Sequence, residues 1–278
     1  MIETPTTTAA LVLAYDGTNF SGFACQTDPP QRTVQGDLER ALATALHLPD
    51  GSLSTTAAGR TDAGVHASGQ VVSFAVPPSE NEVFVPGGIA RFVRSLNALT
   101  PHDISVRELR AVPPDFSARF DALSREYRYR VHTGVTPPLF SRRYAWHLPG
   151  FAADPIRRDR LCQAAAVLVG EHDFSSFAMT ASIEGKNPVR RIFSIDLVDA
   201  ELFGEPLVEI RIVGTAFLHS MVRVIVGTLA AMDAGRIAYD TMADILDARI
   251  RAAAGQTAPP CGLTFSGATY ESFSSCRS

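Results

Sequence analysis

Lysine is almost absent from this sequence: of its 25 basic residues, 24 are arginines and only Lys186 is a lysine. Since Lys186 does not stand in a G-x-x-x-x-G-K-[ST] run, a P-loop is excluded. The four cysteines are widely separated and form no C-x-x-C pair, which argues against a zinc knuckle and against a disulfide framework. No stretch approaches the roughly 18 uncharged apolar residues of a membrane span, so none is predicted.

Other motifs are missing as well. There is no G-x-G-x-x-G for a dinucleotide, no H-E-x-x-H for zinc and no G-x-S-x-G for a hydrolase nucleophile. The first residues lack the basic and continuous apolar regions of a secretory signal peptide. These absences disfavour cofactor chemistry and predict a cytoplasmic protein.

The composition is that of a globular protein. The 278 residues are 46% hydrophobic and 19% charged, which excludes a disordered or collagen-like chain. The net charge of −4 argues against a protein coated in positive charge for nucleic acid, but it permits a basic cleft. In residues 119–147, two acidic residues face six arginines: Arg119, Arg125, Arg128, Arg130, Arg142 and Arg143. Such arginines either bind phosphates or form a solvated charged face.

Hydrophobic periodicity predicts an α+β fold with two halves, 1–112 and 113–278, separated near Pro113-Pro114. The sheets are expected to be largely antiparallel. Strands are predicted at 9–15, 69–76, 103–112, 125–133, 189–199, 207–213 and 263–270. Helices are predicted at 33–47, 88–99, from the Asp154-Pro155 cap to Gly170, at 219–234 and at 239–253.

One segment between two predicted strands carries chemistry. Asp62 lies in a turn flanked by Gly59 and Gly64, small residues that let a bulky ligand approach the backbone. Arg60 would keep a partly buried Asp62 ionised, and an ionised, fixed carboxylate suits covalent catalysis at an electrophilic carbon. The alternative is an Asx-turn, in which Asp62 only caps backbone amides.

The segment GRTDAGVHA, residues 59–67, closely resembles the catalytic motif of the tRNA pseudouridine synthase I family. The resemblance continues in order over nearly the whole chain. It runs through AYDGTNFSGF (14–23), VQGDLERAL (34–42), DFSARFDALSREYRY (115–129), GEHDFSSF (170–177), GTAFLHSMVRVIVGTL (214–229) and GLTFSGATY (262–270).

This resemblance implies the pseudouridine synthase fold, with helices packed outside the sheets and the second half completing an active-site cleft. It implies an isomerase that converts uridine to pseudouridine at positions 38, 39 and 40 in the anticodon stem-loop of tRNA. The uracil–ribose C–N bond breaks and a C5–C1′ bond forms, so neither cofactor nor metal is needed. The family also implies a homodimer.

By the same resemblance Asp62 is the nucleophile, and Arg60 helps to extrude the target base and takes its place. Tyr127 stacks on the flipped base, Leu263 lies near it and Arg223 pairs with the catalytic carboxylate. Stacking must offset a flipping cost of about a few kcal/mol.

Several of these residues also have a purely structural interpretation. Arg223 also fits a helix residue whose charged end reaches solvent, and either Tyr127 or Tyr129 fits a plain core residue. Arg142 and Arg143 are expected to bind tRNA phosphates.

The family pattern is broken at Gly22-Phe23-Ala24, where Gly-Trp-Gln is common, and at the following Cys25. This departure motivates a rival hypothesis, a non-catalytic RNA-binding or RNA-folding module on the same scaffold. A third hypothesis is an N-glycoside-cleaving enzyme that uses Asp62 for hydrolysis.

Overall fold

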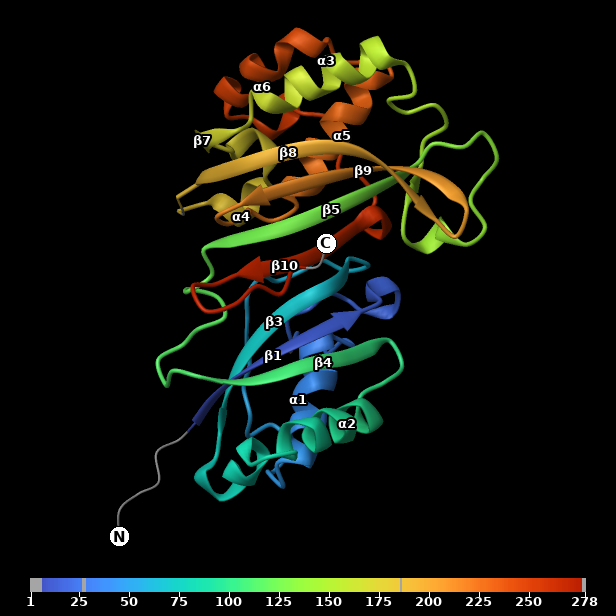
Figure 1. Ribbon diagram of the computed structural model, residues 1–278. Helices are drawn as coiled ribbons and strands as arrows, with labels where there is room; N and C mark the ends of the chain where they lie inside the picture. The colour runs from blue at the N-terminus through green and yellow to red at the C-terminus, as the bar shows by residue number, and fades with distance from the viewer. Residues whose placement is uncertain (1–6, 27–28, 186, 277–278) are drawn as a thin grey trace. The chain divides into compact units, whose positions relative to one another are not determined.

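A computed structural model describes residues 7–26, 29–185 and 187–276 of the chain (Figure 1). The contacts group into two compact units: unit 1 comprises Met1–Leu123 with Phe265–Ser278, and unit 2 comprises Ser124–Thr264. These units differ from the expected halves, because the segment after the Pro113-Pro114 pair stays in unit 1. There the Ala118 carbonyl accepts a 2.7 Å hydrogen bond from Tyr270, near the end of the chain.

The sheet of unit 1 is built around a buried apolar strand, β1, which is antiparallel to both of its neighbours. Leu11 at its centre lies opposite Val72 on one side and Leu109 on the other. In spatial order the strands are β4 (Ile104–Val112), β1 (Thr7–Tyr15), β3 (His66–Val76) and β10 (Leu263–Thr269), with the short β2 (Thr56–Ala57) beside β3.

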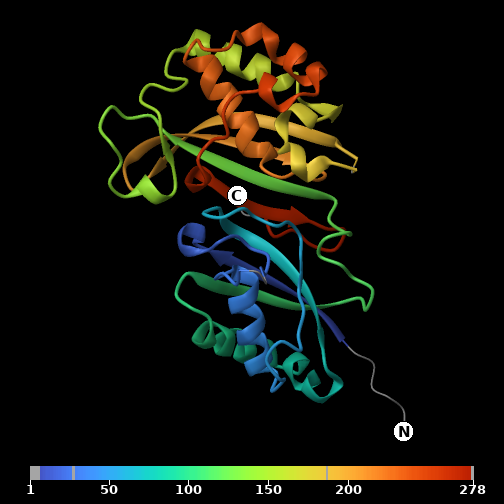
Figure 2. The same cartoon turned by 180° about the vertical axis from the view of Figure 1, so that it is seen from behind.

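Two helices, α1 (Val34–Ala45) and α2 (Gly88–Leu99), accompany this sheet. Thr33 caps α1 by accepting a hydrogen bond from the Gly36 amide, and the apolar stripe of α1 is buried. Figure 2 shows α1 lying across the rear face of the unit 1 sheet. The predicted helical periods at 33–47 and 88–99 are therefore confirmed.

The main strands of unit 2 are also antiparallel to their neighbours. Tyr127 lies opposite Ile212 and Tyr129 opposite Ile210, so both tyrosines share one face. The strands of unit 2, in spatial order, are β5 (Ser124–His132), β9 (Glu205–Gly214), β8 (Val189–Leu202) and β7 (Gly170–Asp173), and β6 (Trp146–His147) runs parallel to β5.

The central helix of unit 2, α5 (Met221–Asp233), is buried on nearly every side. Gly227 lets the chain pass directly over it, since a Cβ there would lie 1.7 Å from the Gln256 carbonyl oxygen. This close approach places the segment 255–262 against α5. The other helices of unit 2 are α3 (Pro155–Ala166), α4 (Thr180–Ile183) and α6 (Met242–Ala248).

Two helix predictions differ from the structure. The helix capped by Asp154 ends at Ala166, and Gly170, with φ of +117°, opens β7 instead of closing the helix. The predicted helix 239–253 is interrupted after α6, where Arg249 adopts a left-handed conformation and the Ile250 amide donates to Ser176 Oγ at 2.9 Å. In both cases pairing with a distant part of unit 2 ends the helix.

The expected α+β class with largely antiparallel sheets is confirmed. Among the described residues, no helix combines the length and the apolar character needed to cross a lipid bilayer.

Candidate active site

Asp62 lies on the loop between β2 and β3, half-buried, and Arg60 on the same loop is exposed. The main chain closes the turn, since the Asp62 carbonyl oxygen accepts a hydrogen bond from the Val65 amide at 3.2 Å. Thr61, between Arg60 and Asp62, is buried, and its hydroxyl oxygen is 2.8 Å from that of Tyr15. Burial raises the pKa of Tyr15 to about 12, which keeps this hydroxyl protonated at neutral pH.

The loop of Asp62 packs against the buried side-chain amide of Gln70, a residue of β3. Gln70 donates to the Gly59 carbonyl at 2.7 Å and accepts from the Gly59 amide, and it also donates to Tyr15 at 3.4 Å. A fully buried side chain that pairs with both backbone groups of one residue fixes that residue in place. Gln70 therefore holds the start of the loop that carries Arg60 and Asp62.

A second support comes from the segment 16–23, between β1 and α1. Gly17 lies directly under the loop, because a Cβ there would be 2.0 Å from the Val65 carbonyl oxygen. The Phe20 carbonyl accepts the Gly64 amide at 3.3 Å, and the Phe23 amide donates to the Thr61 carbonyl at 3.0 Å. Backbone contacts with the segment 16–23 therefore support the loop of Asp62.

His66, the first residue of β3, is buried beside this support. Its Nδ1 accepts a hydrogen bond from the Gly17 amide at 3.1 Å and lies 3.2 Å from Asp16 Oδ1. His66 therefore has a structural role, since its ring contacts two residues of the segment 16–23. The altered Gly22-Phe23-Ala24 element also has a structural role. The Phe23 side chain is 1% exposed, so this residue supports the loop from inside the core.

Tyr127 lies on β5 with its ring edge-to-face against Phe217, at a centroid distance of 5.1 Å and an angle of 81°. Tyr129, two residues along the same face, is fully buried and donates its hydroxyl to the Pro259 carbonyl at 2.8 Å. Burial raises the pKa of Tyr129. Tyr127 is buried as well, at 8% exposed, so both tyrosines belong to the core of unit 2.

Arg223 is held in the first turn of α5. Its Nε donates to the Ala258 carbonyl at 2.8 Å, and the Ala258 amide donates back to the Arg223 carbonyl at 3.0 Å. The side chain is half-buried and fixed, which differs from an arginine that simply extends to solvent. Leu263, five residues after Ala258, is buried at the start of β10.

The segment 258–263 therefore connects the candidate residues of unit 2. It bonds to Arg223 through Ala258 and to the strand of Tyr127 through the Tyr129–Pro259 hydrogen bond, and it leads into Leu263. Asp62 and Arg60 lie together on their own loop in unit 1. Arg142 and Arg143 belong to a separate turn in unit 2.

That turn, Ser141–Arg143, exposes both arginines. The Glu205 carboxylate, at the start of β9, accepts the amides of Leu139, Phe140 and Ser141 at 2.7–3.0 Å. Hydrogen bonds from Ser141 and from these amides lower the pKa of Glu205 to about 2. Sequence analysis missed this residue, because its partners lie more than 60 positions away.

Three of the six arginines in 119–147 are committed to partners inside unit 2. Arg125 donates to the Thr215 carbonyl. On one face of the sheet, Arg128 pairs with Glu126 at 2.8 Å and Arg130 pairs with Glu209 at 3.1 Å. The exposed arginines of this stretch are Arg119, Arg142 and Arg143.

Among the described residues, no group of three or more His, Cys, Asp or Glu side chains is arranged to hold a metal ion.

The sequence profile of tRNA pseudouridine synthase matches residues 11–121 and 164–271 of this chain. Asp62, Arg60, Arg223 and Leu263 fall within the matched segments, whereas Tyr127, Arg142 and Arg143 fall between them.

Similarity over nearly the full length extends to proteins named tRNA pseudouridine synthase A. The protein of Bacillus velezensis is 40% identical over 259 residues, which cover 93% of this chain and 97% of the relative. That of Halalkalibacterium halodurans is 43% identical over 253 residues, covering 91% and 89%. That of Bacillus subtilis is 40% identical over 251 residues, covering 90% and 94%.

The Glu205 carboxylate gives a pH-dependent prediction. Because folding lowers its pKa from 4.5 to about 2, its contribution to stability is complete above pH 4.5 and disappears as the pH falls toward 2. Glu205→Gln should therefore melt below the wild type at pH 7, and the gap in melting temperature should close between pH 4.5 and 2. Calorimetry across this range measures the gap. Glu201→Gln, at an exposed position on β8, serves as the control, and a gap for Glu205→Gln that does not change with pH would contradict the assignment.

Proposed function

Since this chain belongs to the tRNA pseudouridine synthase family, we propose that it isomerises uridine to pseudouridine at positions 38, 39 and 40 in the anticodon stem-loop of tRNA. The observation that carries the proposal is the loop of Asp62: the GRTDAGVH sequence stands complete, on a loop fixed by Gln70 and by the main chain of 16–23. tRNA as substrate also favours a cytoplasmic location.

Asp62 is assigned as the nucleophile. The reaction breaks the bond between uracil N1 and ribose C1′, turns the base and joins C5 to C1′; the C5 proton is lost and N1 gains one, so atoms and electrons balance. Covalent catalysis of this kind requires a carboxylate held at a defined position. The hydrogen bonds on both sides of Asp62, at Thr61 and at Val65, support that role.

Base flipping is assigned to Arg60, with Tyr127 and Leu263 as contacts of the flipped base. The exposed side chain of Arg60 suits a group that enters the stack and replaces the extruded base. By the family resemblance Tyr127 stacks on the uracil, Leu263 contacts it and Arg223 is the counter-ion of the nucleophile. The fixed positions of Tyr127 against Phe217 and of Arg223 against Ala258 favour preorganised roles of this kind.

The altered Phe23-Ala24-Cys25 element does not favour a non-catalytic RNA-binding module. Phe23 is buried and its amide bonds to the loop of Asp62, so the phenylalanine preserves the support of the loop. The catalytic proposal is therefore preferred over the binding module.

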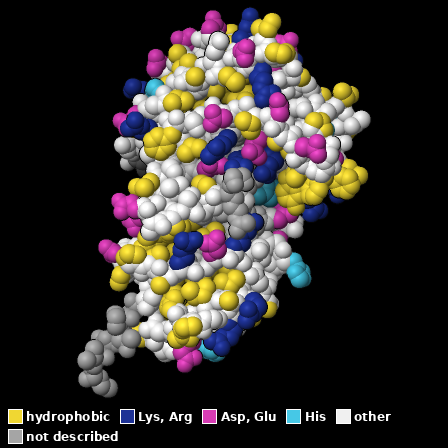
Figure 3. Space-filling view, viewed as in Figure 1, with side chains coloured by type: hydrophobic (Ala, Val, Ile, Leu, Met, Phe, Trp, Pro, Cys, Tyr) yellow, Lys and Arg dark blue, Asp and Glu magenta, His cyan; other side chains and the backbone are white. Residues whose placement is uncertain are grey.

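We also propose that the protein acts as a homodimer. Unit 2 exposes an apolar cluster where the loop before η3 (Ser141–Arg143) meets the turn between β8 and β9, and Figure 3 shows hydrophobic side chains gathered there. The rings of Phe140 and Phe203 are 6.1 Å apart, and both are more than 60% exposed. Clusters of this kind are typical of protein interfaces.

Asp62→Asn should reduce pseudouridine formation by more than about a thousandfold, because the amide keeps the shape but is not a nucleophile. Mapping pseudouridine in unmodified tRNA after incubation measures this, and Asp50→Asn, at an exposed position, is the control. A wild type that binds tRNA without making product would favour the RNA-binding module. Free uracil among the products would indicate glycoside cleavage.

Replacing Arg142 and Arg143 together by alanine should weaken tRNA binding and flatten its salt dependence. Each lost phosphate contact lowers the slope of log affinity against log salt by about 0.7–0.9. Binding titrations at several salt concentrations give the slope, with Arg91→Ala/Arg94→Ala on α2 as the matched control. Unchanged affinity at low salt would place the RNA elsewhere.

Sedimentation of the purified protein should give twice the mass of one 29.9 kDa chain. Phe140→Ser/Phe203→Ser should shift the protein toward the monomer, since it removes apolar contact area. A monomeric wild type at micromolar concentration would contradict the dimer.

A further inference from the structure

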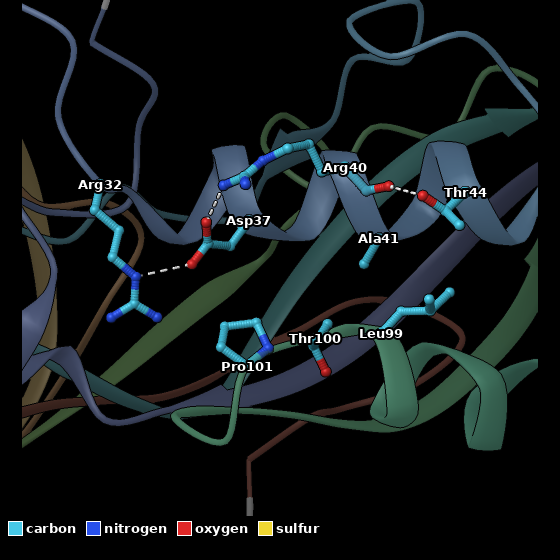
Figure 4. Close-up of a pocket in the computed structure, with 8 residues that line it drawn as sticks. All are labelled: Arg32, Asp37, Arg40, Ala41, Thr44, Leu99, Thr100 and Pro101. Carbon is cyan, nitrogen blue, oxygen red and sulfur yellow. Dashed lines mark hydrogen bonds and ion pairs between the residues drawn. The ribbon is translucent and has the colours of Figure 1, made fainter.

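Arg32, just before α1, connects several parts of unit 1 through its guanidinium. Nη1 and Nη2 donate to the two carboxylate oxygens of Asp103, both at 2.8 Å. Nε donates to Asp37 at 3.0 Å, as Figure 4 shows, and the guanidinium carbon lies 4.1 Å from the centre of the Phe20 ring. A paired fork of this kind is geometrically specific and is lost when lysine replaces arginine.

The main chain of both partners extends this connection. The Asp103 carbonyl accepts the amide of Asp16 at 3.0 Å, and the Arg32 carbonyl accepts the amide of Ser21 at 2.9 Å. With the stacking on Phe20, the Arg32–Asp103 pair holds both ends of the segment 16–21. The segment 16–21 is the first part of the segment 16–23, which supports the loop of Asp62.

The segment 16–21 makes two backbone contacts with the loop of Asp62. Gly17 lies against the Val65 carbonyl, and the Phe20 carbonyl accepts the Gly64 amide. Both contacts are made by residues within three positions of Asp62. A shift of the Phe20 carbonyl therefore moves the turn that presents the carboxylate.

The cavity beside Arg32 offers a different explanation of this charged cluster. It has a volume of about 380 Å³ and is lined by Arg32, Arg40 and Asp37, among others (Figure 4). Asp37 pairs with both arginines, and Asp103 takes the rest of the Arg32 fork. Because two carboxylates balance two guanidinium groups, the cluster has no excess charge with which to bind an anion.

We propose that Arg32 is a positioning residue: with Asp103 and Phe20 it fixes the support segment 16–21 and so sets the position of the Asp62 carboxylate. The inference rests on the proposed function for its kinetic consequence and on the hydrogen bonds alone for its structural one. Misplacement of a reacting group by about 1 Å costs on the order of a hundredfold in rate.

The kinetic test compares Arg32→Met with Arg40→Met in steady-state assays over a range of tRNA concentrations, which separate kcat from the KM for tRNA. Arg40 lines the same cavity and pairs with Asp37, and its Nε donates to the Gly36 carbonyl of its own helix, so it is the matched control. Arg32→Met should lower the rate by about 10- to 100-fold with the KM for tRNA changed less than about twofold. Arg32→Lys, which keeps the charge without the fork, should also lower the rate.

A rate for Arg32→Met and Arg32→Lys equal to that of Arg40→Met would overturn the proposal, and so would a loss confined to KM. If Arg32→Met does not fold, the comparison of Arg32→Lys with Arg40→Met decides.

Hydrogen exchange supplies a readout that does not depend on activity. Arg32→Lys should speed exchange in peptides covering 58–66, whose Gly64 and Val65 amides are hydrogen-bonded, whereas Arg40→Met should not. Unchanged exchange there would overturn the positioning role. A wild type that forms no pseudouridine would instead refute the proposed function, and the exchange result would then decide the positioning role by itself.

Discussion

Main-chain contact between the segment 16–23 and the loop of Asp62 is the constraint on which the candidate active site depends. The Gly17 backbone approaches the Val65 carbonyl so closely that no side chain fits between them. Two further backbone hydrogen bonds, at Phe20 and Phe23, complete the contact. A loop supported by backbone keeps its position with little dependence on side-chain rotamers, and that suits the role of nucleophile proposed for Asp62.

Unit 2 uses the same device in another place. Gly227 lets the Gln256 carbonyl approach α5, and the following residues then bond to Arg223 and Tyr129. The segment 255–262 is therefore a structural element that fixes Arg223 and the strand of Tyr129. In each unit, a glycine at a packed position decides where the candidate residues lie.

Ion pairing decides which arginines of this protein remain available to a negatively charged partner. Summed over the sequence, the net charge of −4 is a poor guide to an RNA partner, and the six arginines of 119–147 are a better one. Even these separate into two classes once folded: Arg128 and Arg130 pair with Glu126 and Glu209 on the sheet, where Arg211 also pairs with Glu126, whereas Arg142 is exposed on a turn held by a carboxylate. The second class is the one to which we assign the salt-dependent affinity for tRNA.

The sequence by itself determined the α+β class, the main strands and helices and the turn of Asp62, because periodicity, caps and glycines act within a few residues of one another. It did not determine where the helix predicted at 239–253 breaks, or how Arg32 and Glu205 are used. Those depend on partners far away along the chain, such as Asp103 for Arg32 and Ser141 for Glu205. Only the tertiary structure decided them, since side-chain pairing and burial exist only after distant segments have packed.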